Sequence, residues 1–301
     1  MYGTESGYSR REFLYKTAIA GGGLLSLGAL AGCAKKSASL NANMQFGLVT
    51  YQWGKDWDLP TLIKNCELSQ VHAVELRTLH AHGVEPSLTT EQRVEVKKRF
   101  SDSPVICLGY GSNQEYHSPD PVILQKNIDE TCELIKLCHD IGATGLKVKP
   151  NDLPDEIPPE KTIAQIAAAL NRVGTFAAEY GQKIRVEVHG RKTQELPNMK
   201  AIFDQVTAKN VFMCWNCNDE DLLPPGLEAN FNLVQDRLGD TVHIRELNIG
   251  NYPYPQLFGL LAGMNYHGNI LLEARTEPAD LVAALIEQQK IFTEMIEATK
   301  D

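Results

Sequence analysis

Residues 183–189 have the sequence KIRVEVH, in which apolar side chains alternate strictly with charged or polar ones. The apolar side chains are Ile184, Val186 and Val188, and the polar set is Arg185, Glu187 and His189. Alternation with a period of two indicates a β-strand, because successive side chains of a strand point to opposite faces of the sheet. This run therefore predicts a strand with one apolar face and one charged face.

Seven further runs of β-forming residues lie on either side of it. The eight predicted strands are 45–51, 71–78, 104–110, 145–149, 183–189, 210–216, 241–247 and 269–274. Helical patterns fill most of the gaps and are clearest at about 120–141 and 159–180, where apolar residues recur every three or four positions. Gly142 and Gly181 follow these two patterns, where glycine commonly ends a helix. Strands that alternate with helices predict a parallel sheet.

Eight strands within residues 45–301 predict an α/β protein with a single (β/α)8 TIM barrel, since these 257 residues match the usual barrel size of about 250. A doubly wound open sheet is the alternative, but no GxGxxG motif follows the first predicted strand. In a barrel the apolar face packs against the helices, so the charged face points into the lumen. An antiparallel sheet with one solvated face would explain the alternation but not the intervening helices.

The whole chain has 301 residues, of which 43% are hydrophobic and 22% are charged, and its formal net charge is −9. This composition excludes a disordered or collagen-like chain, and the negative charge argues against nucleic acid as a partner. Seven cysteines are too few for a disulfide scaffold. Cys214 and Cys217 form a CxxC motif that ends a predicted strand, whereas redox motifs open a helix, so we expect no redox role for it.

The N-terminal residues resemble an export signal. Arg10 and Arg11 precede Phe-Leu, which resembles a twin-arginine signal. The uncharged run 17–32 is broken by glycines and is short for a membrane span of about 20 residues, as expected of a signal peptide. It ends in the sequence LAGC at residues 30–33, which resembles a bacterial lipobox.

These signals predict three segments. They are a signal peptide at 1–32, a lipidated Cys33 that opens a polar tether at 33–44, and the barrel at 45–301. We therefore expect an exported lipoprotein of the bacterial periplasm or cell surface, attached to the membrane through its lipid only. An N-terminal anchor that is never cleaved is the alternative.

Four short motifs stand at the ends of the later predicted strands. They are Val186-Glu187-Val188-His189, Cys214-Trp215-Asn216, Val242-His243-Ile244-Arg245-Glu246 and Leu272-Glu273-Ala274. Their order and spacing resemble the xylose isomerase-like superfamily of sugar isomerases and epimerases, and the resemblance covers essentially all of 45–301. It implies a barrel whose active face binds one divalent metal ion through Glu, Asp, His and Glu from strands five to eight.

Glu187, His243 and Glu273 match three of the implied metal ligands. Asn216 stands where the family has Asp, and its carbonyl oxygen can bind a metal without adding charge, while Asp219 is the alternative ligand. This set suits Mn²⁺, Mg²⁺ or Zn²⁺ and does not choose among them. The structural alternatives are a lumen ion pair for Glu187 and a core position for His243.

Other polar residues at the same ends of the strands are predicted to contact a substrate. His189 lies two residues past Glu187 and is predicted to act as an acid or a base. Lys147 and Lys149 are predicted either to bind substrate oxygens or only to balance the glutamates. The remaining candidates are His80, His82, Arg191 and Tyr51, with loop exposure or packing as their alternatives.

The resemblance implies a metal-dependent sugar isomerase or epimerase that transfers a proton next to a carbonyl, with Glu187 and Glu273 as acid–base groups. The predicted export favours an unphosphorylated sugar, because sugar phosphates are cytoplasmic. One alternative is a lyase that acts on 3-keto-glycosides by β-elimination through an enolate, and another is a non-catalytic sugar-binding lipoprotein. The superfamily also contains a nuclease, which the negative charge disfavours. A homo-oligomer remains an open alternative to a monomer.

Overall fold

Eight parallel strands close into a barrel in the order β1-β10-β9-β8-β6-β4-β3-β2 in the computed structural model, which describes residues 43–299. The strands are β1 (Gln45–Val49), β2 (Ala73–Arg77), β3 (Ile106–Glu115), β4 (Gly145–Lys149), β6 (Lys183–Glu187), β8 (Val211–Asn216), β9 (Leu238–Ile244) and β10 (Asn269–Leu272). The predicted TIM barrel is confirmed. The open-sheet and antiparallel alternatives are wrong, because β1 pairs with β10 and every barrel pairing is parallel.

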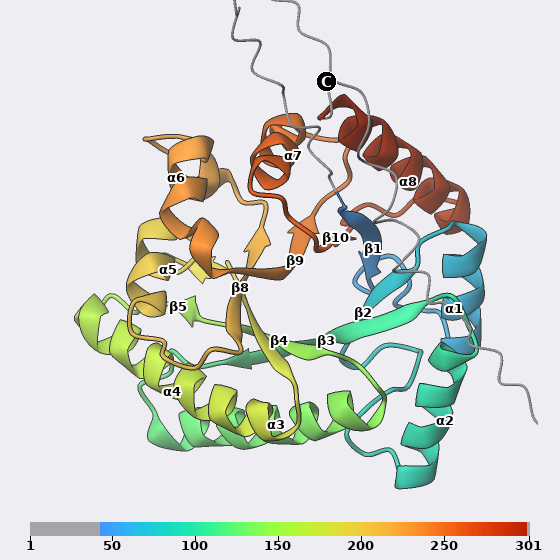
Figure 1. The fold of residues 1–301 in the computed structure, drawn as a ribbon. Helices are drawn as coiled ribbons and strands as arrows, with labels where there is room; N and C mark the ends of the chain where they lie inside the picture. The colour runs from blue at the N-terminus through green and yellow to red at the C-terminus, as the bar shows by residue number, and fades with distance from the viewer. Residues whose placement is uncertain (1–42, 300–301) are drawn as a thin grey trace, which may run out of the picture. The chain divides into compact units, whose positions relative to one another are not determined.

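Helices surround the ring of strands, as Figure 1 shows. They are α1 (Leu59–Leu68), α2 (Thr90–Ser101), α3 (Pro121–Asp140), α4 (Pro159–Glu179), α5 (Leu196–Phe203), α6 (Leu227–Val234), α7 (Tyr254–Gly263) and α8 (Leu281–Ala298). Side chains fix several helix starts: Asp58 accepts from the amide of Thr61 at 2.9 Å, and Thr89 forms a capping box with Gln92. The two clearest predicted helices, α3 and α4, are confirmed to within one residue at each end.

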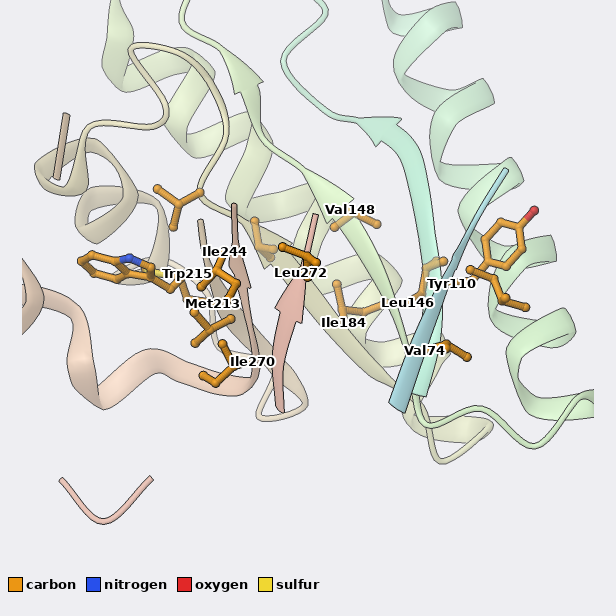
Figure 2. Close-up of a cluster of buried hydrophobic side chains, with 14 of the residues drawn as sticks. Val74, Tyr110, Leu146, Val148, Ile184, Met213, Trp215, Ile244, Ile270 and Leu272 are labelled. Carbon is orange, nitrogen blue, oxygen red and sulfur yellow. The ribbon is translucent and has the colours of Figure 1, made fainter. Parts of the chain in front are cut away.

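The apolar and charged faces of the strands point as predicted. The apolar set packs outward against the helices in one buried cluster, part of which is shown in Figure 2. Strand residues such as Val148 and Ile184 join helix residues such as Ile135 and Leu170 in this cluster, and all four have no exposed surface. The opposite face carries buried charged side chains, among them Glu75, Lys147, Arg185 and Glu187. The hydrophobic core therefore lies between the strands and the helices and surrounds a polar lumen.

A second, small apolar cluster lies apart from the main core. It consists of Val49, Ala73, Leu108 and Leu271. Ala73 and Leu271 each precede a glutamate of the lumen face by two residues, so these two side chains lie one layer below Glu75 and Glu273, whereas Val49 is in register with Glu75.

Arg185 fills the neighbouring space beside two glycines of the strands. A Cβ atom at Gly109 or Gly145 would lie only 2.6 or 2.7 Å from its Nη1. The absence of side chains at these two glycines therefore makes room for a buried guanidinium.

Some strand boundaries differ from the prediction, because hydrogen-bonded strand pairing extends beyond the residues that show the alternating pattern. Strand β3 continues to Glu115, because a register shift brings Glu115 beside Lys149. Strand β9 begins at Leu238 and ends at Ile244, three residues earlier than predicted at each end. Two short strands, β5 (Asn151–Asp152) and β7 (Gly190–Arg191), form a separate parallel pair that the sequence pattern did not predict.

The predicted signal peptide and Cys33 lie outside the described residues. Within residues 43–299, none of the helices combines the length and the apolar character that a membrane span requires. All six cysteines of this part, including Cys214 and Cys217, are free thiols, which agrees with the expectation that they build no disulfide frame.

Candidate metal and substrate site

Three predicted metal ligands meet at the carboxyl ends of their strands. Glu187 ends β6, His243 lies in β9 and Glu273 directly follows β10. Each offers one ligand atom, and these atoms all lie within 4.8 Å of one another. Two carboxylates and one imidazole at this spacing form a ligand set that suits a divalent ion. The three residues are called the metal cluster below.

Within residues 43–299 the two ring nitrogens of His243 lack hydrogen-bond partners, and this indicates that the metal cluster fits a metal ion. The ring has no exposed surface, and neither of its nitrogens has a hydrogen-bond partner among the described residues. Nδ1 lies 3.9 Å from Oε1 of Glu187, and Nε2 lies 3.4 Å from Oε1 of Glu75. Buried polar atoms are rarely left unpaired, because their lost hydration is costly. A metal ion among the three ligands would give one ring nitrogen a partner.

Lys147 and Asn216 hold the carboxylate of Glu187. The Nζ atom of Lys147 lies 2.6 Å from Oε2, and Nδ2 of Asn216 donates to Oε1 at 3.1 Å. Burial alone would raise the pKa of Glu187, but Lys147 and His243 hold it well below its usual value. The carboxylate is therefore ionised and available as a ligand.

The two candidates for the fourth ligand differ in their positions. Asn216 is buried at the end of β8 and touches the metal cluster through Glu187. Asp219 is exposed at the start of a short 3-10 helix (Asp219–Leu222) and is not part of the cluster. The geometry thus favours Asn216 over Asp219.

A cavity of about 460 Å³ opens at the metal cluster. Its lining residues are Tyr51, Gln52, Arg77, Lys149, Glu187, His189, Glu273 and Arg275. Five of these eight were predicted as site residues, namely Tyr51, Lys149, Glu187, His189 and Glu273. The volume is that of a small-molecule site, and the lining is predominantly charged.

The cavity wall carries positive groups beside its two glutamates. The guanidinium of Arg77 lies over the Tyr51 ring, 5.6 Å from its centroid, and Nη2 donates to Asn113 at 3.0 Å. Burial and the nearby charge of Lys147 lower the pKa of Lys149 to about 8. These cations can donate hydrogen bonds to the hydroxyl or carbonyl oxygens of a polar ligand.

His189 faces the cavity from the residue pair that follows β6. Its Nδ1 lies 3.0 Å from Oδ1 of Asn151. Burial lowers the pKa of His189 below its ordinary value, although the charge of Glu187 opposes the shift. This shift favours the neutral imidazole, the form that can accept a proton.

Four of the predicted substrate residues lie away from the cavity lining. Lys147 has no exposed surface and is committed to Glu187, so it balances charge. Arg191 pairs with Asp152 at 3.0 Å and with Asp155 at 2.8 Å on the surface. The structure does not bring these two side chains to the cavity, and their contacts with a substrate stay predictions.

The two histidines after β2 form hydrogen bonds with nearby groups of the chain. Both ring nitrogens of His82 bond to backbone, with Nε2 at 2.8 Å from the carbonyl oxygen of Arg77 and Nδ1 at 3.0 Å from the amide of Val84. His80 is half-buried, and its Nδ1 lies 3.3 Å from Oγ1 of Thr50. The structure therefore does not place either of them at the cavity, and they bring no second metal cluster among the described residues.

Four functional residues were missed by the sequence prediction. Arg77 and Arg275 line the cavity, Gln52 lies beside the predicted Tyr51, and Glu75 approaches His243. Glu75 and Arg77 belong to the charged face of a predicted strand, which is the signal that could have found them. Gly111 also reflects this site, since a Cβ atom there would lie 2.6 Å from Oε1 of Glu75.

Comparison with known proteins gives a family and a set of similar folds. A family model described as "Xylose isomerase-like TIM barrel" matches residues 69–297. A solved L-ribulose 3-epimerase is 15% identical, with a TM-score of 0.72, over 85% of this chain and 95% of the other. At this identity the likeness shows the fold.

Two further solved structures have the same fold. A 3-keto-D-glucoside 4-epimerase from E. coli is 14% identical, with a TM-score of 0.70, over 83% of this chain and 99% of the other. The IOLI protein, solved with a bound zinc atom, is 14% identical, with a TM-score of 0.72, over 85% and 99% of the two chains.

Proposed function

The chain belongs to the xylose isomerase-like TIM barrel family, and from this and its site we propose that it is a divalent-metal-dependent sugar isomerase or epimerase. The observation that carries the proposal is the metal cluster of Glu187, His243 and Glu273 at a charged cavity of about 460 Å³. The similar solved structures include epimerases of L-ribulose, D-allulose and 3-keto-D-glucoside, which supports a sugar as the substrate class.

Proton transfer next to a carbonyl needs a base, a group that stabilises the enediolate oxygen, and an acid. A divalent ion held by the metal cluster, with Asn216 beside it, would supply Lewis-acid polarisation of the substrate carbonyl. Glu187 ends β6 and Glu273 directly follows β10, and β8 and β9 lie between these two strands, so the two glutamates approach a substrate from different directions. We assign them the removal and return of the proton.

The cations of the cavity wall orient the sugar. Arg77, Lys149 and Arg275 reach the cavity from β2, β4 and the segment after β10, and all three are hydrogen-bond donors. They bind hydroxyl oxygens and keep the reacting carbon within reach of the two glutamates. His189 faces the same cavity and assists the proton transfer.

The substrate that we propose is an unphosphorylated sugar or sugar derivative. The support for this choice is the predicted export signal, because sugar phosphates are cytoplasmic. A second candidate is β-elimination from a 3-keto-glycoside, in which removal of the C2 proton gives an enolate that expels the C1 substituent. The fold shared with a 3-keto-D-glucoside 4-epimerase favours this candidate, since both reactions begin at a carbon made acidic by the ketone.

Hydrogen–deuterium exchange tests the proposal directly. The protein is incubated in D₂O with Mn²⁺ and with a panel of free sugars and 3-keto-glycosides, and deuterium next to the carbonyl is followed by NMR. We expect exchange with at least one sugar, and loss of a C1 substituent would select the elimination.

The Glu273→Gln variant should lower the exchange rate at least about 100-fold, the lower end of what a positioned acid–base group contributes. Glu277→Gln, an exposed carboxylate on the same loop, is the matched control and should keep full activity. Undiminished exchange in Glu273→Gln would refute the role of Glu273. A protein that binds no divalent ion would refute the enzyme assignment and leave a sugar-binding protein.

A further inference from the structure

A row of hydrogen-bonded side chains leads away from the cavity through His189. Oδ1 of Asn151 lies 3.0 Å from Nδ1 of His189, and Nδ2 of Asn151 donates to Oε2 of Glu115. His189 lines the cavity together with Glu187 and Glu273, whereas Asn151 and Glu115 do not. The proposed function assigns no role to these two residues.

The chemistry of the three groups fixes the direction of both hydrogen bonds. Nδ2 of Asn151 donates to Oε2 of Glu115, so the side chain of Asn151 turns its NH₂ group toward Glu115 and its carbonyl oxygen toward His189. A carbonyl oxygen only accepts, so Nδ1 of His189 must carry a hydrogen and donate it to Asn151. No described residue hydrogen-bonds to Nε2, which is therefore the ring nitrogen left for a ligand in the cavity.

The backbone keeps this row in place. Asn151 has a φ of 75°, in the left-handed region that asparagine and glycine tolerate best. It pairs with Gly190 in the short β5–β7 ladder, next to His189 in the chain. A Cβ atom at Gly190 would lie 1.9 Å from the carbonyl oxygen of Asn151, so only glycine allows this approach. The strained pair sets the distance between Asn151 and the imidazole.

We propose that Asn151, oriented by Glu115, is a positioning residue that locks His189 with its hydrogen on Nδ1 and its lone pair on Nε2. Nε2 then accepts a hydrogen bond, and in the reaction a proton, from a hydroxyl group of the bound sugar. An acceptor behind Nδ1 is a common way to orient a histidine that acts as a base. This inference deepens the proposed function and rests on it for the substrate class only.

NMR of the full-length protein labelled with [¹⁵N]histidine, without metal and at pH 8, tests the tautomer. Long-range ¹H–¹⁵N spectra distinguish the protonated ring nitrogen from the unprotonated one, and His189→Gln identifies the signals of His189. We expect hydrogen on Nδ1 in the wild-type protein. Asn151→Gly suits the left-handed backbone and removes the amide, so the ring should shift toward the form with hydrogen on Nε2.

A double variant supplies the matched control. Asn151→Asp combined with Glu115→Gln reverses the donor and acceptor between positions 115 and 151 but keeps an acceptor at Nδ1 of His189. The wild-type tautomer should return in this variant. The kcat should fall by up to about 100-fold in Asn151→Gly and recover in the double variant, with little change in KM.

The NMR spectra test the positioning role of Asn151, and sugar turnover tests the proposed function. Hydrogen on Nε2 in the wild-type protein, or a tautomer that Asn151→Gly leaves unchanged, would overturn the positioning role. The spectra need neither metal nor substrate. The expected spectra without turnover of any sugar would therefore refute the proposed function while the positioning role stands.

Discussion

Asn216 is the residue at which this chain departs from the metal-ligand set that the family resemblance implies. It is buried, and its Nδ2 donates to Glu187 at 3.1 Å, so an amide and not a carboxylate stands beside the metal cluster. An aspartate here would place two carboxylates together, which is unfavourable without a metal and favourable with one. Asn216 therefore reduces the dependence of the folded protein on a bound ion.

The variant Asn216→Asp should change both the stability of the metal-free protein and its affinity for a metal ion. In the presence of EDTA its melting temperature should fall, because the carboxylates of residues 187 and 216 repel each other. Its affinity for Mn²⁺ should rise at least about tenfold, equivalent to about 1.4 kcal/mol. Thermal unfolding and calorimetric titration measure the two effects.

The control is Asn232→Asp, which makes the same change of charge at an exposed position of α6. It should alter neither quantity. An unchanged metal affinity in Asn216→Asp would mean that this side chain does not reach the metal.

The sequence predicted the residues of the metal cluster but not their neighbours across the lumen. Glu187, His243 and Glu273 each follow a strand pattern in a family order, so local sequence was sufficient. The approach of Glu75 to His243 joins β2 to β9, which are far apart in the chain, and no local pattern encodes that distance. The local bonds of His82 likewise depend on a loop conformation that periodicity does not describe.

At the scale of elements, one ion-pair network ties together strands that are not neighbours. Asp240 in β9 accepts from Nε of Arg185 at 2.8 Å and from Nζ of Lys183 at 2.7 Å, and both cations lie in β6. Strand β8 lies between β6 and β9 in the barrel. Arg185 also donates to the carbonyl oxygen of Leu108 in β3 at 3.0 Å. The Arg185 side chain in β6 therefore links β9 and β3 across the lumen.

Replacing Asp240 by Asn should be costly because it leaves the buried charge of Arg185 without a counterion. We expect a loss on the order of 3 kcal/mol in the free energy of unfolding at pH 7. Burial would raise the pKa of Asp240, but Arg185 and Lys183 hold it well below its usual value. The stabilisation is therefore complete above the unfolded-state pKa of about 3.9 and is lost as the pH falls toward the lower, folded-state pKa.

Urea unfolding as a function of pH measures this contribution. The wild-type protein should lose stability below about pH 4, and Asp240→Asn should lose less over the same range. Asp102→Asn removes an exposed partner of Lys98 and should leave the unfolding midpoint essentially unchanged. Parallel pH curves for the wild type and Asp240→Asn would contradict the assigned role.

The elements themselves were predictable to the extent that they repeat a pattern. All eight barrel strands have enough residues to show alternation or an apolar run, and α3 and α4 are long enough to show a helical period. The strands β5 and β7 have two residues each, so they contain no period. Their pairing depends on the left-handed backbone of Asn151 and the bare Cα of Gly190, which only the folded chain reveals.

For the whole molecule, metal binding should be linked to folding stability. A ligand that binds only the folded state stabilises it, by about 2.7 kcal/mol when its free concentration is 100 times the Kd. Added Mn²⁺ should therefore raise the melting temperature, and EDTA should reverse the effect. His243→Gln should lose this increment, whereas His139→Gln, at an exposed position of α3, should keep it.

The increment should also depend on pH. Burial would lower the pKa of His243, but neighbouring Cys214 and Glu75 raise it well above its usual value. The metal must then displace a proton, so the increment should be smaller at pH 6 than at pH 8. Equal increments at the two pH values would show that His243 is not a ligand that competes with protons.

The apolar cluster of Val49, Ala73, Leu108 and Leu271 bears on how a substrate reaches the cavity and how a product leaves it. Ala73 and Leu271 fill the lumen one layer below Glu75 and Glu273, and the charged cavity lies above them at the carboxyl ends of the strands. Under the proposed function, substrate and product both bind in this one cavity. Two epimers that differ at a single carbon would, under this function, compete for the same donors, Arg77, Lys149 and Arg275, so the product should inhibit the enzyme.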